Sequence, residues 1–206
     1  MAERPILFSG EMVRAILEGR KTQTRRVIKP QPSGGVRWNA VVLNGYGGWT
    51  DGHGAPLRCP YGQPGDKLWV RETIYEYEYG VWCYRADGEY VRCDPADKGK
   101  MLAWAHHKKT RSCSSIHMPR WASRITRVIT EIRAERVQDI SEADAMAEGV
   151  SVSHYYCEEP TDKHEGLHRC DPIGKFRTLW DSINAKRGYP WDDNLWVWAI
   201  SFKAEG

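Results

Sequence analysis

The stretch Gly19-Arg20-Lys21-Thr22-Gln23-Thr24-Arg25-Arg26 marks the place where one type of secondary structure gives way to another. Apolar residues recur at helical spacing over residues 11–18, and a glycine directly after them is a common helix stop. β-Branched residues are frequent over residues 20–28, which favours an extended strand. Side chains two apart on a strand share a face, so Lys21 and Thr24 come together only if the chain bends near Gly19. The stretch therefore predicts a helix, a stop and a basic strand.

The rest of the chain predicts short strands with few helices between them. Strands are expected over residues 5–8, 67–72, 125–137 and 195–202, a helix capped by Ser141 up to Glu148, and a second helix over residues 176–185. Residues 30–64, 75–121 and 150–190 are read as insertions, the first with one short strand at 41–43 and the second with a hairpin turning at 86–88. We expect an α+β fold, a small mixed β-barrel with flanking short helices and long loop insertions, in a single domain over residues 1–206.

Charge and cysteine usage limit the function classes. The 30 basic and 27 acidic residues give a net charge of +3, too small to indicate a nucleic-acid partner by itself. Basic residues are nevertheless concentrated over residues 14–29, where Glu18 is the one acid. The six cysteines form no CxxC pair and the N-terminus has no apolar signal region, so we expect a reduced, cytoplasmic protein. No apolar run approaches the ~20 residues of a membrane span.

The opening stretch resembles the hallmark of the ASCH family, relatives of the PUA RNA-binding domains, whose pattern is Gly-x-Lys-x-x-Glu-x-Arg. Gly19, Lys21 and Arg26 match it, and Thr24 stands where the general pattern has Glu. That variant is similar to the small bacterial N4-acetylcytidine amidohydrolases of the family. Residues 64–70 and 195–202 also resemble elements of this subgroup, and the helix after the 125–137 strand places Glu148 on its catalytic Glu. Chains with this motif and the three insertions resemble proteins common in phage and prophage genomes.

The resemblance implies a catalytic set of Lys21, Thr24 and Glu148. Amide hydrolysis needs a nucleophile, a base and a donor for the oxyanion. Thr24 is the candidate nucleophile, and Lys21 activates it if either burial or the nearby Arg25 and Arg26 favour its neutral amine. Glu148 handles the leaving amine or a water. The open alternative is that Lys21 and Arg26 form a basic strand face for phosphates, that Thr24 is there for its strand propensity, and that Glu148 is a solvated helix end.

Other residues are candidates for binding rather than for chemistry. Arg20, Arg25 and Arg26 are expected to guide or bind an anionic ligand, with Arg26 able to clamp Glu148. Tyr61 and Trp104 are expected to stack on bases, because they lie in loops.

A zinc site is an alternative use of the histidines and cysteines. The two candidate groups are His106, His107, Cys113 and His117, and Cys157, His164, His168 and Cys170. Neither group has the paired spacing of a known zinc class, so we predict no metal and no cofactor.

The favoured function is therefore a nucleic-acid- or modified-nucleoside-directed ASCH protein, an amidohydrolase for an acylated exocyclic amine such as that of N4-acetylcytidine. A non-catalytic module that binds RNA or DNA is the main alternative. A ribonuclease is a further alternative, although no suitably placed histidine pair supports it. The expected partners are a nucleoside, RNA or DNA.

Overall fold

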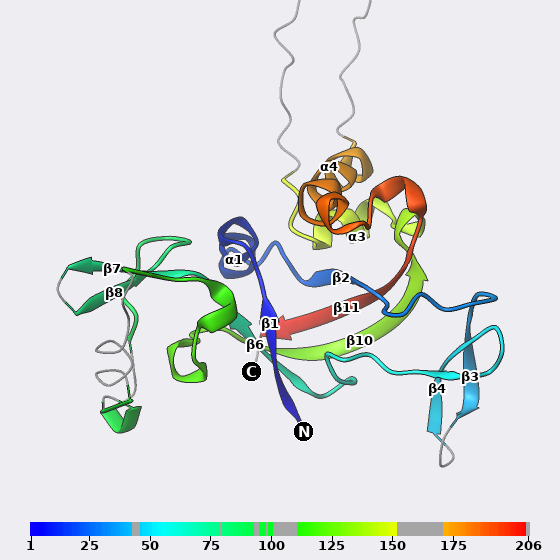
Figure 1. Cartoon of the computed structure of the whole chain (residues 1–206), viewed down its shortest axis with the longest axis horizontal. Coiled ribbons are helices and arrows are strands. Elements are labelled where there is room, and N and C mark those ends of the chain that lie inside the picture. Colours follow the sequence, from blue (N-terminus) through cyan, green and yellow to red (C-terminus); the bar gives the residue numbers. More distant parts are fainter. Residues whose placement is uncertain are drawn as a thin grey trace, which may run out of the picture. The chain divides into compact units, whose positions relative to one another are not determined.

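The structure is a computed structural model that describes residues 1–42, 46–78, 80–92, 95–97, 99–100, 111–151 and 171–204. These residues form eleven strands in three sheets together with a few helices (Figure 1). The expected α+β class is confirmed. Within the described ranges no sheet closes into a barrel, so the finer expectation of a barrel remains a prediction.

Contacts divide the chain into two compact units. The first unit contains Met1–Thr22, Arg58–Arg133 and Ile200–Gly206, and the second contains Gln23–Leu57 and Ala134–Ala199. The single domain expected over residues 1–206 stays a prediction beside this division.

The largest sheet has five strands in the order β1, β6, β10, β11, β2. Their bounds are Glu3–Leu7 for β1, Lys67–Arg71 for β6, Thr126–Arg136 for β10, Trp196–Ala204 for β11 and Gln23–Val27 for β2. β1 is parallel to β6, with Glu3 opposite Lys67, and β10 is antiparallel to β6, with Thr126 opposite Trp69. All five strands were expected from the sequence, with ends displaced by a few residues.

The first unit contains the helix and stop that the opening stretch predicts. Helix α1 spans Gly10–Leu17, and the Ser9 side chain accepts a hydrogen bond from the Met12 N–H at its start. Gly19 follows with φ of 74°, a left-handed conformation that glycine adopts without strain. The helix therefore ends where the chain must turn toward β2.

A second sheet of the first unit corrects the predicted hairpin. It has the order β8, β7, β9, with bounds Val81–Tyr84, Ile74–Glu78 and Ser112–Cys113. Ile74 lies opposite Tyr84, so the chain reverses at Gly80, whose φ is 76°, and not at residues 86–88. Residues 86–88 make a later turn, after which Tyr90 bridges Cys83. Turn-forming residues occur both at Gly80 and at 86–88, so the sequence did not show at which of the two the hairpin reverses.

A third sheet, in the second unit, corrects the first predicted insertion. β3 (Val36–Val42), β4 (Tyr46–Asp51) and β5 (Pro56–Leu57) pair in that order, where one short strand was expected at 41–43. The sequence did not predict β4, because it contains two glycines, which have low strand propensity. Gly47 has a local reason: a Cβ there would lie 2.7 Å from Cζ2 of Trp38, so only glycine lets that indole lie against the strand.

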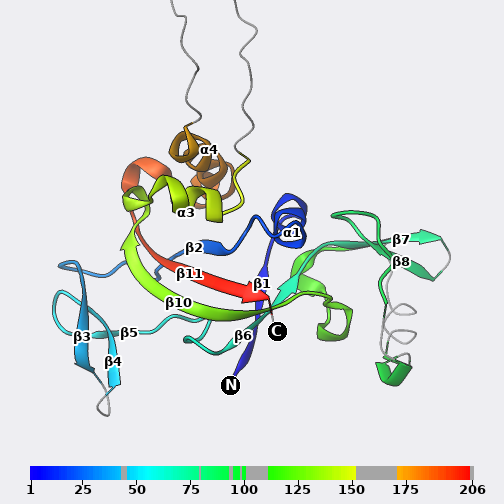
Figure 2. The same ribbon diagram turned by 180° about the vertical axis from the view of Figure 1, so that it is seen from behind.

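In the second unit, α3 contacts β2 and α4 packs against α3 (Figures 1 and 2). α3 spans Glu142–Ala147; Ser141 accepts from the Asp144 N–H at its start, as predicted, and Glu148 is its C-cap residue. α4 spans Pro172–Asn184, longer than predicted because Asp171 caps it and a proline suits its first position. α3 and α4 share one apolar core, made of Val137, Ile140, Ala145, Phe176, Trp180, Trp191 and Val197.

Short 3-10 helices complete the described residues. They span Pro95–Asp97, Ser115–His117, Arg120–Ala122, Val137–Asp139, Ala185–Arg187 and Trp191–Asp193.

Candidate functional site

The three predicted catalytic residues are all buried. Lys21 is 2% exposed, Thr24 2% and Glu148 3%. Thr24 and Glu148 belong to the second unit, whereas Lys21 belongs to the first, where its Nζ lies 5.5 Å from the centroid of the Phe8 ring. The convergence of all three in one pocket therefore stays a prediction.

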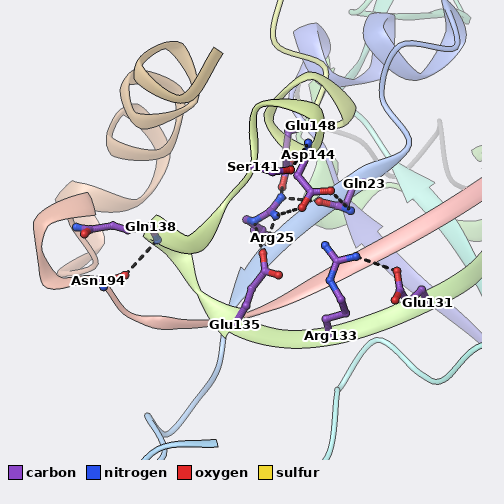
Figure 3. Close-up of polar contacts among 10 residues, drawn as sticks. All are labelled: Gln23, Arg25, Glu131, Arg133, Glu135, Gln138, Ser141, Asp144, Glu148 and Asn194. Carbon is purple, nitrogen blue, oxygen red and sulfur yellow. Dashed lines mark hydrogen bonds and ion pairs between the residues drawn. The ribbon is translucent and has the colours of Figure 1, made fainter. Parts of the chain in front are cut away.

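Glu148 lies in a buried network around one guanidinium, which we call the Arg25 cluster (Figure 3). Its members are Gln23, Arg25, Glu135, Asp144 and Glu148. The Arg25 side chain is fully buried, with 0% of its surface exposed. Nε and Nη2 of Arg25 donate to Oε1 of Glu135 over 2.9 and 2.6 Å. Two nitrogens of the guanidinium thus donate hydrogen bonds to one carboxylate.

The remaining contacts of Arg25 tie β2 to α3. Nη2 also donates to Oδ2 of Asp144 over 3.2 Å, and Nη1 lies 3.5 Å from Oε1 of Glu148 and 2.6 Å from Oε1 of Gln23. Gln23 in turn donates from Nε2 to Oδ1 of Asp144 over 3.1 Å. One arginine and one amide therefore hold two carboxylates of α3.

Simple periodicity explains how these side chains meet. Gln23 and Arg25 are two apart on β2 and share a face, and Asp144 and Glu148 are four apart at α3 and share a side of the helix. Thr24 lies between Gln23 and Arg25, so the alternation of the strand directs its side chain to the opposite face of β2. The structure thus brings Glu148 to Arg25. Strand alternation predicts that the Thr24 side chain lies on the other face of β2.

The predicted ligand-binding residues differ in their surroundings. Arg20 is exposed and donates from Nε to Glu18 over 2.7 Å. Arg26 and Tyr61 are half-buried, and Trp104 lies outside the described residues. The Arg25 guanidinium contacts Glu148, and the expected clamp of Glu148 by Arg26 stays a prediction. Because Arg25 is buried among carboxylates, its place is structural to the site and not that of a surface guide for anions.

Sequence reasoning missed Gln23, Glu135 and Asp144. A usable signal was present, since polar residues at i and i+2 on a strand and acids at i and i+4 on a helix can form complementary faces. The sequence does not show that α3 contacts β2, or that β10 lies two strands away from β2 in the same sheet.

A second buried charge cluster, in the first unit, is self-contained. Arg124 donates from Nε and Nη2 to the two oxygens of Glu72 over 2.9 and 3.0 Å, and from Nη1 to Asp87 over 2.8 Å. Its guanidinium lies 3.8 Å from the centroid of the Tyr84 ring. Burial raises the pKa of Glu72, with Arg124 opposing it, and burial raises the pKa of Tyr84 to about 12. Each carboxylate oxygen of Glu72 has an Arg124 donor, so the cluster anchors structure.

Among the described residues, no group of three or more His, Cys, Asp or Glu side chains is arranged to hold a metal ion. Of the two candidate zinc-ligand groups, the residues at 106–107 and within 157–170 lie outside the described ranges. Cys59, Cys83 and Cys113 are free thiols, and burial raises the pKa of Cys59 to about 11. No helix in the described ranges is both long and apolar enough to cross a bilayer.

Comparison of the chain with protein-family models, with curated proteins and with solved structures found no match.

Proposed function

We propose that this chain is an ASCH-type hydrolase that removes an acyl group from the exocyclic amine of a nucleoside, with N4-acetylcytidine as the reference substrate. The proposal starts from the resemblance of residues 19–26 to the ASCH hallmark. It further assigns the five-stranded sheet and α1 to the core of a PUA-like barrel, as the order of the elements suggests. A cytoplasmic setting and a phage or prophage origin belong to the same proposal.

The observation that carries the proposal is the burial of Lys21, Thr24 and Glu148, none of which is more than 3% exposed. Lysine and glutamate are among the residues least often buried, because removing their charge from water is costly. A strand face that holds phosphates would leave Lys21 in water, and a solvated helix end would leave Glu148 there. Burial therefore disfavours both alternative interpretations and favours a protected site.

The chemistry divides into attack and departure. A nucleophilic oxygen attacks the acyl carbon, the carbonyl oxygen gains negative charge, and the C–N bond then breaks as the amine nitrogen takes a proton. Lys21 supplies a buried cation or amine, and Glu148 supplies a carboxylate that moves a proton. The attacking oxygen is either Oγ of Thr24 or a water that Glu148 activates. Attack by Thr24 leaves the acyl group as an ester on Oγ, which a water then hydrolyses to the free carboxylic acid, whereas attack by water releases the acid directly. The expected placement of Thr24 on the opposite face of β2 from the Arg25 cluster makes a separate test of this residue necessary.

Chromatographic detection of cytidine after incubation with N4-acetylcytidine tests the proposal. Loss of a group that takes part in proton transfer lowers turnover by roughly 100-fold or more, which we expect for Lys21→Met and for Glu148→Gln. Thr24→Val abolishes turnover if Thr24 is the nucleophile and spares it if water attacks. Arg177→Gln, a change at an exposed ion pair with Asp192, is the control and should keep full activity. Full activity of Lys21→Met would contradict the proposed catalytic roles.

One observation favours the second candidate, a module that binds single-stranded nucleic acid without turnover. Trp38 on β3 is 58% exposed, packs edge-to-face against Trp49 at 5.2 Å and lies over Gly47. A held and exposed indole suits base stacking. Quenching of tryptophan fluorescence by a single-stranded oligonucleotide, weakened by salt and lost in Trp38→Ala, would support this candidate over hydrolysis.

A further inference from the structure

Arg25 binds the carboxylates of its cluster with unequal hydrogen bonds, and this difference indicates a role for the arginine. Arg25 makes two hydrogen bonds of 2.9 and 2.6 Å to Glu135 on β10, but its contact with Glu148 is a single one of 3.5 Å. The arginine is therefore fixed by Glu135 and extends one nitrogen toward Glu148. Figure 3 shows the guanidinium between Glu135 on one side and the α3 carboxylates on the other.

Neighbouring groups keep the guanidinium in one orientation. Its centre lies 5.7 Å from the centroid of the Phe176 ring, and its Nη1 donates to Oε1 of Gln23 over 2.6 Å. Gln23 is itself fixed by its hydrogen bond to Asp144. A planar guanidinium held on several sides presents its remaining N–H in a fixed direction.

Glu148 needs such a partner because of where it lies. It is the C-cap residue of α3, and its side chain is 3% exposed. A carboxylate at a helix C-terminus faces the negative end of the helix dipole, and burial adds a desolvation cost. A nearby cation offsets both effects and restricts the rotamers of the carboxylate.

We propose that Arg25 is a positioning residue that holds Glu148 as an oriented carboxylate for proton transfer. The inference rests on the proposed hydrolysis for its purpose, whereas the positioning itself is a property of the protein without substrate. Gln23 and Glu135 are part of the same device, because they fix the arginine. Arg25 itself is 0% exposed and takes no part in bond making.

The first test needs no turnover. In NMR spectra of the wild-type protein the two Hγ protons of Glu148 should have separate resonances, because one rotamer is held. In Arg25→Met they should merge toward a single averaged position. Arg133→Gln removes an arginine paired on the protein surface with Glu131 and serves as the matched control, with Glu148 resonances unchanged. Unchanged resonances in Arg25→Met would overturn the inference.

The second test separates kcat from KM with N4-acetylcytidine. Misplacement of a catalytic group by about 1 Å costs roughly 100-fold, so we expect kcat of Arg25→Met to fall about 100-fold with KM changed less than about threefold. Arg25→Lys restores the charge without the fork and should recover about tenfold of this loss. Equal kcat in wild type and Arg25→Met would overturn the inference and leave the hydrolysis standing.

If Arg25→Met does not fold, Glu135→Gln weakens the anchor and should give the same NMR change with a smaller loss of kcat; no change in either would overturn the inference. If the wild-type protein does not release cytidine, the hydrolysis fails. The NMR comparison then decides the positioning of Glu148 by itself.

Discussion

Replacement of Arg25 by Met should strongly destabilise the second unit. The change leaves Glu135, Asp144 and Glu148 without the cation that they share, and it leaves the Gln23 amide without one partner. Breaking a buried ion pair by removing one partner costs about 3–5 kcal/mol, since the other charge stays buried.

The surroundings of the carboxylates fix the expected value within that range. The side chains of Glu135 and Asp144 are 16% and 25% exposed, so water can solvate them after the change, whereas Glu148 at 3% has little access to water. We therefore expect the lower end, a loss of about 3 kcal/mol in the free energy of unfolding.

Urea unfolding followed by tryptophan fluorescence measures this loss, with the slope m compared between variants to detect a change of mechanism. Arg133→Gln, at an exposed pair on β10, should change stability by no more than about 0.5 kcal/mol. The double variant Arg25→Met/Glu135→Gln should be less destabilised than the sum of the single variants, by about 1–3 kcal/mol. A loss below about 1 kcal/mol in Arg25→Met, or strict additivity in the double variant, would refute the reasoning.

Three further predictions concern local structure. The hydrogen bond from the Ala2 N–H, 2.7 Å long, lowers the pKa of Asp66 in the folded protein. The stability that the Asp66 carboxylate contributes is therefore present above its unfolded pKa of about 3.9 and is lost as pH falls through the lower folded pKa. In urea unfolding, the loss of stability caused by Asp66→Ala should accordingly become smaller in acid. Ser141→Ala removes the cap of α3 and should cost about 1 kcal/mol in the same assay, whereas Ser141→Asp should cost almost nothing. Gly47→Ala places a Cβ within 2.7 Å of the Trp38 ring and should shift tryptophan emission, an effect that must vanish in a Trp38→Phe background.

Local signals predicted much of the fold. Gly19 ends α1, Ser141 begins α3, and the alternation of apolar and polar residues over 125–137 predicts β10. Each of these signals depends on neighbours within a few residues along the chain. Elements that are recognisable only through their pairing partner were harder to predict. β4 contains Gly47, whose presence makes sense only against Trp38, and that contact arises from the pairing of two strands.

The candidate site shows the same division. Lys21 and Glu148 are buried, and both could be selected from the motif and the helix end, while their catalytic roles stay a prediction. The role of Arg25 could not be selected, since a basic residue beside other basic residues looks like part of a surface charge. Its burial follows from carboxylates more than 100 positions away along the chain, at residue separations of 110 to Glu135 and 123 to Glu148.

Comparison of wild type and Lys21→Met in cytidine release from N4-acetylcytidine is the decisive measurement. Methionine keeps most of the buried aliphatic volume of Lys21 and removes only the amine, so the fold should persist and can be checked by unfolding. We predict cytidine release by the wild-type protein and a loss of roughly 100-fold or more in Lys21→Met. No release by the wild-type protein, or equal release by both proteins, would contradict a hydrolase whose chemistry depends on the buried lysine.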